Sequence, residues 1–125
     1  MISYYEKSTL ELLGKHIGFK NPISGREISS LINLKTKGVE GAEMRNIIHQ
    51  LRLKNYPICA TFNGYYYAMT IEELENFRKI LKNRIREQYQ IWKILGSLET
   101  IKKVGKNPDL PSEEDELKEL SLMCS

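Results

Sequence analysis

The stretch that most constrains this chain is CATFNGYYYAM, residues 59–69, in which an Asn-Gly pair separates two short runs of β-forming residues. Asn-Gly is the strongest short-range signal for a type I′ hairpin turn, because both central residues of that turn need a positive φ. A turn at Asn63–Gly64 pairs Phe62 with Tyr65, Ala60 with Tyr67 and Ile58 with Met69, with all six side chains on one face. A ribbon of only two strands is marginally stable alone, so we expect the hairpin to pack on helices.

Helical patterns occupy the chain before this hairpin. The first predicted helix spans residues 5–16. A second begins at Ser24, which forms a capping-box pattern with Glu27, and ends near Leu34. The third covers about residues 39–54, and its apolar residues recur at helical spacing. These residues are predicted to be buried: Met44, Ile47, Ile48 and Leu51.

A long helix is predicted after the hairpin, from Ile71 to Lys103, and it is opened by a second capping-box pattern at Thr70 and Glu73. The apolar residues of its first half are expected to cover the small domain: Leu74, Phe77, Leu81 and Ile85. A helix of about 30 residues spans about 45 Å at 1.5 Å per residue, which is longer than such a domain needs. The apolar residues of the second half therefore predict a homodimer interface: Ile91, Trp92, Ile94, Leu95, Leu98 and Ile101.

The charge of the chain changes sign near its end. Residues 1–105 carry 17 Lys and Arg against 10 Asp and Glu, a net charge of +7, whereas residues 106–125 carry two against six, a net charge of −4. A basic body with an acidic tail is a weak sign of nucleic-acid binding. The sequence thus predicts a domain at 1–70, a long packing helix at 71–104 and an acidic tail at 105–125, which is either flexible or a short docking helix.

Several protein classes are not expected from the sequence. No apolar run approaches the roughly 20 residues of a membrane span, and the first residues do not resemble a signal peptide, so we expect a cytoplasmic protein without a membrane partner. Cys59 is expected to be a small core residue, and the two cysteines and two histidines do not stand at metal-ligand spacing. No catalytic constellation or phosphate-binding Gly-rich motif is present, so neither an enzyme nor a metal or other cofactor is expected.

The order helix, short helix, helix, hairpin is that of a winged helix-turn-helix domain. The segments GREISSLINL, EMRNIIHQLRLKNYPIC and GYYYAMTIEELENF also resemble the small winged-helix proteins of phages and prophages, over about residues 23–98. The resemblance implies a mainly α fold with one β-hairpin, in which a winged helix-turn-helix is followed by a long C-terminal helix. The linker KTKGVEG, at residues 35–41, is longer than the usual turn of that family, which leaves the start of the third helix open.

In a winged helix the third helix enters the DNA major groove and the hairpin forms a wing beside it. Positions of the third helix that the core does not use are candidates for DNA contact: Gly41, Arg45, Asn46, His49 and Arg52. The residues before that helix are candidates for phosphate contact: Lys35, Thr36 and Lys37. The predicted wing offers Asn63 and Tyr65 but no Lys or Arg.

Two functions remain open at the level of sequence. One is a dimeric DNA-binding regulator of transcription or replication in a phage or prophage, which the basic body and the order of elements favour. The other is a phage-encoded adaptor or inhibitor that uses the winged-helix scaffold to bind a host protein complex of replication or defence. Glu40 and Glu43 on the predicted third helix, the wing without basic residues and the acidic tail favour this second function.

Overall fold

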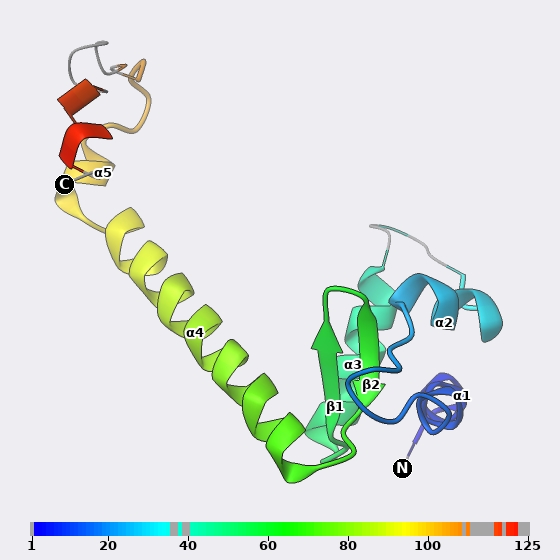
Figure 1. The fold of residues 1–125 in the computed structure, drawn as a ribbon. Helices are drawn as coiled ribbons and strands as arrows, with labels where there is room; N and C mark the ends of the chain where they lie inside the picture. The colour runs from blue at the N-terminus through cyan, green and yellow to red at the C-terminus, as the bar shows by residue number, and fades with distance from the viewer. Residues whose placement is uncertain are drawn as a thin grey trace. The chain divides into compact units, whose positions relative to one another are not determined.

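The computed structural model of the 125-residue chain describes residues 2–35, 38, 41–108, 110, 117, 118 and 120–122. Its elements are α1 (Tyr4–Leu13), α2 (Gly25–Leu31), α3 (Ala42–Leu53), β1 (Ile58–Thr61), β2 (Gly64–Tyr67), α4 (Ile71–Leu95) and α5 (Leu98–Ile101) (Figure 1). The prediction of a mainly helical chain with one antiparallel hairpin is therefore confirmed. None of the helices among these residues combines the length and the apolar content that crossing a bilayer requires.

The chain forms two compact units, Met1–Arg84 and Ile85–Ser125, and the boundary between them falls inside α4. The first unit contains α1, α2, α3, the hairpin and the first turns of α4. The second contains the last turns of α4, α5 and the tail.

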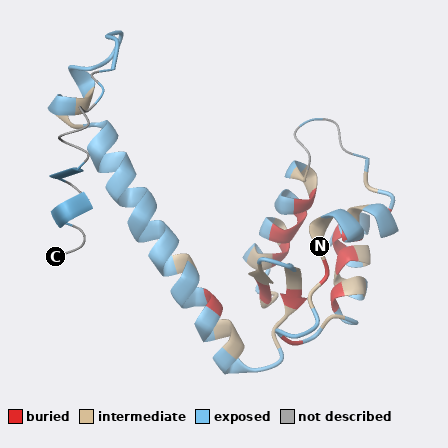
Figure 2. Ribbon diagram, turned by 45° about the horizontal axis from the view of Figure 1, so that its top comes forward, coloured by how far each residue is buried: buried red, intermediate tan, exposed pale blue. Residues whose placement is uncertain are grey.

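The core of the first unit lies between the three N-terminal helices and the hairpin. Figure 2 shows buried residues gathered in α1, α3 and the hairpin. All four α3 residues predicted from helical spacing are buried, at 0–8 % exposure. They pack with apolar residues of the neighbouring elements: Leu13, Ile23, Ile28, Ile32 and Ile58. The periodicity identified this face correctly because a helix that buries one side must carry its apolar residues three and four apart.

Side-chain caps fix where α1 and α2 begin. Ser3 and Glu6 form a complete capping box at the start of α1. The Ser24 hydroxyl accepts from the Glu27 backbone N–H at 3.1 Å, which places the start of α2 where the sequence predicts it. Each cap satisfies an amide that the first turn of a helix otherwise leaves without a partner.

The predicted register of the hairpin is wrong, because the turn begins one residue earlier than predicted and each β1 residue pairs with a partner two positions earlier. Ile58 pairs with Tyr67, Ala60 with Tyr65 and Thr61 with Gly64, so the turn consists of Phe62 and Asn63. Asn63 has no positive φ, as a type I′ turn at Asn63–Gly64 would require. Gly64 is instead the first residue of β2, with φ 140°, and a Cβ on it would lie 2.3 Å from the backbone oxygen of Ile23. The glycine therefore permits a close backbone approach rather than the turn.

The segment before α2 lies along the free edge of β2. Ile23 and Tyr65 exchange two backbone hydrogen bonds of 2.8 Å. Further along the same strand, Gly18 donates to Tyr67 O at 2.9 Å and Tyr67 donates to His16 O at 3.0 Å. These bonds attach the connection between α1 and α2 to the hairpin, and they leave fewer unpaired groups on that edge.

A second cluster attaches the start of α4 to the other face of the hairpin. Cys59, Tyr66 and Phe77 are buried there, which confirms Cys59 as a core residue. Burial raises the pKa of the Cys59 thiol and raises that of Tyr66 to about 12, so both side chains are uncharged at neutral pH. The Glu73 carboxylate accepts from the N–H groups of Phe19 and Met69, each at 2.8 Å, and these bonds lower its pKa.

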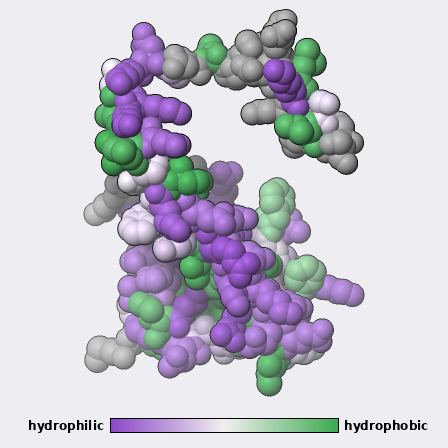
Figure 3. All heavy atoms as spheres, turned by 90° about the vertical axis from the view of Figure 1, so that its left-hand side faces the viewer, coloured by the Kyte–Doolittle hydropathy of each residue, from purple (hydrophilic) through white to green (hydrophobic). Residues whose placement is uncertain are grey.

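The long helix ends earlier than the sequence pattern predicts. It stops at Leu95 instead of Lys103, and Ser97 caps the short helix α5 by accepting from the Thr100 N–H. Gly96 carries a low helix propensity and Ser97 a high N-cap propensity, and together they outweigh the continuing apolar stripe. Ile85, predicted to cover the domain, is 69 % exposed, whereas Leu74 and Leu81 pack on the second cluster as expected. Figure 3 shows apolar side chains, in green, among the polar ones at the surface.

We predict that Gly64→Ala destabilises the first unit by more than about 2 kcal/mol, since the new Cβ clashes with backbone and the φ is unfavourable for alanine. Urea unfolding followed by circular dichroism measures this. Gly14→Ala is the matched control, because its φ is −62° and its Cβ meets no atom closer than 3.4 Å. A loss below about 0.5 kcal/mol in Gly64→Ala, the range of ordinary surface substitutions, would contradict the close approach to Ile23.

A second prediction concerns the pH dependence of stability. Lys54 donates to the Glu6 carboxylate at 2.6 Å, and this hydrogen bond is the main cause of the lowered pKa of Glu6. Because the pKa falls below the unfolded value of about 4.3, the stabilisation is complete above that pH and is lost as the pH falls through the folded pKa. Glu6→Gln keeps a capping side chain but removes the charge, so it should cost about 1 kcal/mol near neutral pH.

Urea unfolding of Glu6→Gln and of the unmodified chain, repeated from about pH 7 to about pH 2, tests this linkage. The difference between the two proteins should shrink as Glu6 becomes protonated. Glu75→Gln is the control, because Glu75 pairs with Arg78 on an exposed helix surface and should contribute at most about 0.5 kcal/mol. A difference for Glu6→Gln that stays constant over this range would contradict a charge effect.

Candidate nucleic-acid interface

The side of α3 that faces away from the core is open to solvent. Arg45, Asn46 and His49 are all exposed and lie on this side, as their helical spacing predicts. Arg45 and His49 stand four residues apart, so their side chains are neighbours on one surface. The structure therefore brings three of the predicted α3 residues together on a surface that a partner can reach.

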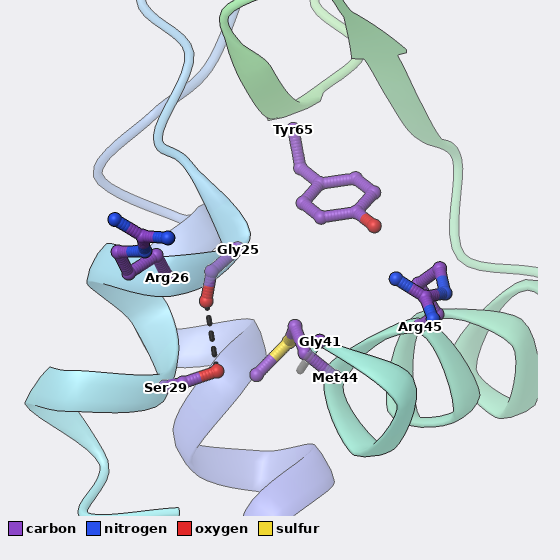
Figure 4. A pocket seen from close by; sticks show the side chains of 7 residues that line it. All are labelled: Gly25, Arg26, Ser29, Gly41, Met44, Arg45 and Tyr65. Atoms are coloured by element: carbon purple, nitrogen blue, oxygen red, sulfur yellow. Dashed lines mark hydrogen bonds between the residues drawn. The ribbon is translucent and has the colours of Figure 1, made fainter. Parts of the chain in front are cut away.

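A hollow of about 420 Å³ lies at the N-terminal end of this surface. Residues from α2, from the start of α3 and from β2 line it: Gly25, Arg26, Ser29, Gly41, Met44, Arg45 and Tyr65. Figure 4 shows Arg26 on α2 at one side and Arg45 on α3 at the other, with the ring of Tyr65 extending from β2 between the two helices. The hollow is thus bordered by two helices and a strand, and the Ser29 hydroxyl at its edge already donates its hydrogen to the Gly25 carbonyl.

Two glycines give the hollow its shape. A Cβ on Gly25 would lie 3.3 Å from the Tyr65 ring and 3.4 Å from Met44 Cγ, so a side chain there would crowd the floor. A Cβ on Gly41, which has φ 83°, would lie 3.0 Å from Nη1 of Arg45. The missing side chain at Gly41 therefore leaves space in which the Arg45 guanidinium lies back against the start of α3.

Arg52 does not lie with the other three α3 residues. Its Nε donates to the backbone oxygen of Ile58 at 2.9 Å, and its guanidinium carbon lies 5.0 Å from the centre of the Phe77 ring. Burial lowers its pKa, although an arginine remains protonated under all ordinary conditions. Its Nη2 atom is buried without a hydrogen-bond partner among the described residues. Arg52 therefore connects α3 to β1 and to α4.

The remaining predicted residues are spread more widely. Lys35 is exposed just after α2, while Thr36 and Lys37 lie outside the described residues. Asn63 is exposed in the hairpin turn, where its N–H donates to Thr61 Oγ1 at 3.0 Å. In the second unit, the six residues of the predicted dimer interface are each 52–70 % exposed.

Sequence reasoning did not identify Arg26 and Ser29 as site residues. Both lie in α2, where the Ser29 hydroxyl donates to the Gly25 carbonyl at 2.8 Å. The capping pattern at Ser24 and Glu27 does predict that Arg26 stands in a first helical turn. No local signal indicates that this turn lies beside the start of α3, because their proximity depends on contacts between distant segments.

The described residues contain no cluster of three or more His, Cys, Asp or Glu side chains that could hold a metal ion. Comparison of the chain with protein-family models, with curated proteins and with solved structures finds no match. The function is therefore argued from the geometry and charge of the α3 surface and the hollow.

Proposed function

We propose that this protein is a DNA-binding protein of the winged-helix type that regulates transcription or replication in a phage or prophage. The observation that carries the proposal is the exposed surface of α3, on which Arg45, Asn46 and His49 stand together at the edge of a basic unit. Residues 1–84 carry 13 Lys and Arg against 8 Asp and Glu, a net charge of +5, which favours a polyanionic partner.

The topology of the first unit supports this proposal. A winged helix has three helices, a short strand between the first and second, and a hairpin after the third. The pairing of Ile23 with Tyr65 supplies such a short strand before α2, and β1 and β2 follow α3. In this arrangement α3 takes the place of the recognition helix and the hairpin takes the place of the wing.

The chemistry of the α3 surface suits base edges in the major groove. An Asn side chain forms paired hydrogen bonds with adenine, and Arg does so with guanine. Arg45, Asn46 and His49 are proposed to contact bases. Phosphate contacts are proposed for Lys35, Thr36 and Lys37, with Asn63 and Tyr65 on the wing side. Arg52 is left out of the proposed contacts because it is engaged with Ile58 and Phe77.

We predict that Asn46→Ala weakens binding to a preferred duplex by about 1–3 kcal/mol, because the paired hydrogen bonds to one base are lost. Binding to a scrambled duplex should change much less. Fluorescence anisotropy at several salt concentrations, with a preferred duplex selected from a random pool, measures both affinities. Asn83→Ala is the matched control, since Asn83 is an exposed asparagine on α4.

The prediction separates three outcomes. Equal losses on preferred and scrambled duplexes would mean that Asn46 contacts only the DNA backbone. Unchanged binding in both Asn46→Ala and His49→Ala would contradict base recognition by α3. Failure of the unmodified chain to bind any duplex at low salt would contradict the proposed function itself.

We further propose that the protein acts as a homodimer through the second unit. Six apolar side chains stay exposed there in a single chain, and burying each large one would stabilise by about 1.5–3 kcal/mol. The described leucines of the tail, Leu110, Leu117, Leu120 and Leu122, are themselves exposed and leave these residues uncovered. A second copy in twofold symmetry would cover both surfaces and present two α3 helices to two half-sites.

Light scattering at tens of micromolar is predicted to give the mass of a dimer for the unmodified chain and of a monomer for the Trp92→Glu/Leu95→Glu double variant. Trp92 is the only tryptophan and is 70 % exposed in a single chain, so its emission should shift to longer wavelength on dilution. Leu31→Glu, which adds a charge at an exposed leucine of α2, is the control. A monomeric mass for the unmodified chain would end the dimer proposal.

A second candidate function is the binding of a host protein, and one observation favours it. An apolar hollow of about 390 Å³ lies between the hairpin and the start of α4, lined in part by Phe19, Phe62 and Ile80. Phe62 at the hairpin turn is fully exposed, and exposed apolar surface commonly marks a protein interface. A folded chain that binds no duplex at low salt would favour this function over DNA binding.

A further inference from the structure

We propose that the outer edge of β1 and the apolar hollow beside it form a docking site for an extended segment of a partner protein, one that carries a large apolar side chain next to an acidic one. The site lies between the hairpin and the start of α4, and no described residue of α3 lines it. The proposal is therefore independent of the proposed DNA binding. It rests on the second candidate function, the binding of a protein, and gives the chemistry of the segment that is bound.

The outer edge of β1 presents an unpaired set of backbone groups. Tyr65 of β2 uses both its N–H and its C=O to bond Ile23, at 2.8 Å each, so neither group points toward β1. Ala60 is the β1 residue opposite Tyr65, which makes the two a pair without hydrogen bonds between them. The N–H and C=O of Ala60 therefore point away from β2, and they have no hydrogen-bond partner among the described residues. An added strand bonds to groups of this kind.

The preceding part of the same edge is already occupied, and this fixes where a segment can pair. The Ile58 N–H donates to Tyr56 O at 2.9 Å, and the Ile58 carbonyl accepts from Arg52 Nε at 2.9 Å. The open part of the edge therefore begins at Ala60 and continues toward the turn. An incoming segment is directed to the end of β1 that lies next to the apolar hollow.

The apolar hollow can receive a side chain of such a segment. Ala60, Thr61 and Phe62 line it from β1 and the turn, and Phe77 and Ile80 line it from α4. Phe62 and Ile80 are exposed, so a bound apolar group would cover both. The volume of about 390 Å³ lies in the range of about 300–1,000 Å³ that is typical of sites for small organic groups. Because alternate side chains of a strand point to one face, one residue of the segment can enter the hollow while its neighbours pair with Ala60.

The charges beside the site favour an acidic residue in the segment. Arg84 is exposed and lies seven residues after Phe77, two turns along the same side of α4. Burial is the main cause of the lowered pKa of Arg52, and the positive charge of Arg84 also lowers it, which indicates that the two cations lie near each other. Glu73 is the only carboxylate among the described lining residues, and it already accepts two backbone N–H groups. A carboxylate of the partner would therefore meet a positive field.

The first experiment selects peptides from a random displayed library on the full chain. The selected peptides are expected to share one large apolar residue with Asp or Glu close to it, because the hollow is apolar and its surroundings are basic. A selection that enriches no common sequence, or one rich in Lys and Arg, would overturn the proposal. The most enriched peptide, synthesised with a fluorescent label, is the probe for the variants.

Variants of the edge and the hollow are compared by fluorescence anisotropy with this peptide. Ala60→Pro removes the outward N–H without removing a bond to β2, and it is expected to weaken binding by about five- to tenfold. Phe62→Ser/Ile80→Ser removes apolar surface and is expected to weaken binding by at least about tenfold. Leu31→Ser, at an exposed leucine of α2, is the matched control and should leave the affinity unchanged. Unchanged affinity in both site variants, each shown to be folded by circular dichroism, would overturn the docking site.

The charge of the segment is tested separately. Arg84→Glu is expected to weaken binding of the peptide by about two- to fivefold at low salt, and the difference should shrink as salt is added. Arg78→Glu is the matched control, because Arg78 pairs with Glu75 on the exposed surface of α4. Equal losses in the two variants would overturn the assignment of an acidic residue to the segment.

Hydrogen exchange of the unmodified chain tests the strand pairing without a substitution. The Ala60 amide, followed by NMR, is expected to exchange more slowly when the peptide is bound. Peptide binding that shifts Phe62 and Ile80 but leaves the exchange of Ala60 unchanged would mean that the occupant is not a strand, which overturns the proposal. Slowed exchange of Ala60 on concentrating the chain alone would identify a second copy as the occupant and would overturn the assignment to a partner protein.

Duplex binding of the same variants separates this proposal from the proposed function. Ala60→Pro is expected to bind a duplex as tightly as the unmodified chain does. A chain that binds a duplex but selects no peptide would contradict the docking site and leave DNA binding in place. A chain that binds the selected peptide but no duplex would contradict DNA binding and support the docking site.

Discussion

Two reciprocal hydrogen bonds between Ile23 and Tyr65 determine how the parts of the first unit meet. Each is 2.8 Å long, and together they hold β2 against the residues that lead into α2. Because α2 begins two residues after Ile23, the same pairing places Gly25 beside the Tyr65 ring. The approach is possible only because Gly64 has no side chain. The hollow between α2, α3 and β2 is therefore a direct consequence of this backbone pairing.

The hairpin lies in the middle of the chain, and its two faces pack against helices that precede and follow it. Ile58, Tyr65 and Tyr67 pack on the core of the three N-terminal helices, whereas Cys59 and Tyr66 face Phe77 of α4. Successive residues of a strand point to opposite faces, so four residues per strand are enough to serve two clusters. Arg52 joins these two sides, since it extends from α3 to the Ile58 carbonyl and the Phe77 ring. A short ribbon that would be marginal alone is thus stabilised on both faces.

Features that depend on neighbours in the sequence could be predicted, and features that depend on distant contacts could not. Helical spacing identified the buried residues of α3, and the hydroxyl of Ser24 identified the start of α2. The predicted turn was wrong because a glycine is required at position 64 by the close backbone of Ile23, about forty residues earlier, and not by the turn. The predicted register nevertheless kept Ile58, Tyr65 and Tyr67 on one face, because it differs by an even number of residues from the observed pairing. Ala60, predicted on the same face, packs instead on the second cluster. Arg26 could not be predicted as a site residue, since nothing in α2 indicates which elements surround it.

The placement of charge on the first unit limits which residues can make the proposed DNA contacts. Residues 58–69 contain no Lys or Arg, so phosphate contacts in this region must come from elsewhere. Under the proposed function these contacts would come from the residues before α3 and from the exposed side of that helix, where Arg45 lies. Arg52, on the same helix as Arg45, is committed to packing and contributes its charge only at a distance. Of the two α3 arginines, therefore, Arg52 is excluded from the proposed DNA surface by its contacts with Ile58 and Phe77, whereas Arg45 remains exposed on that surface.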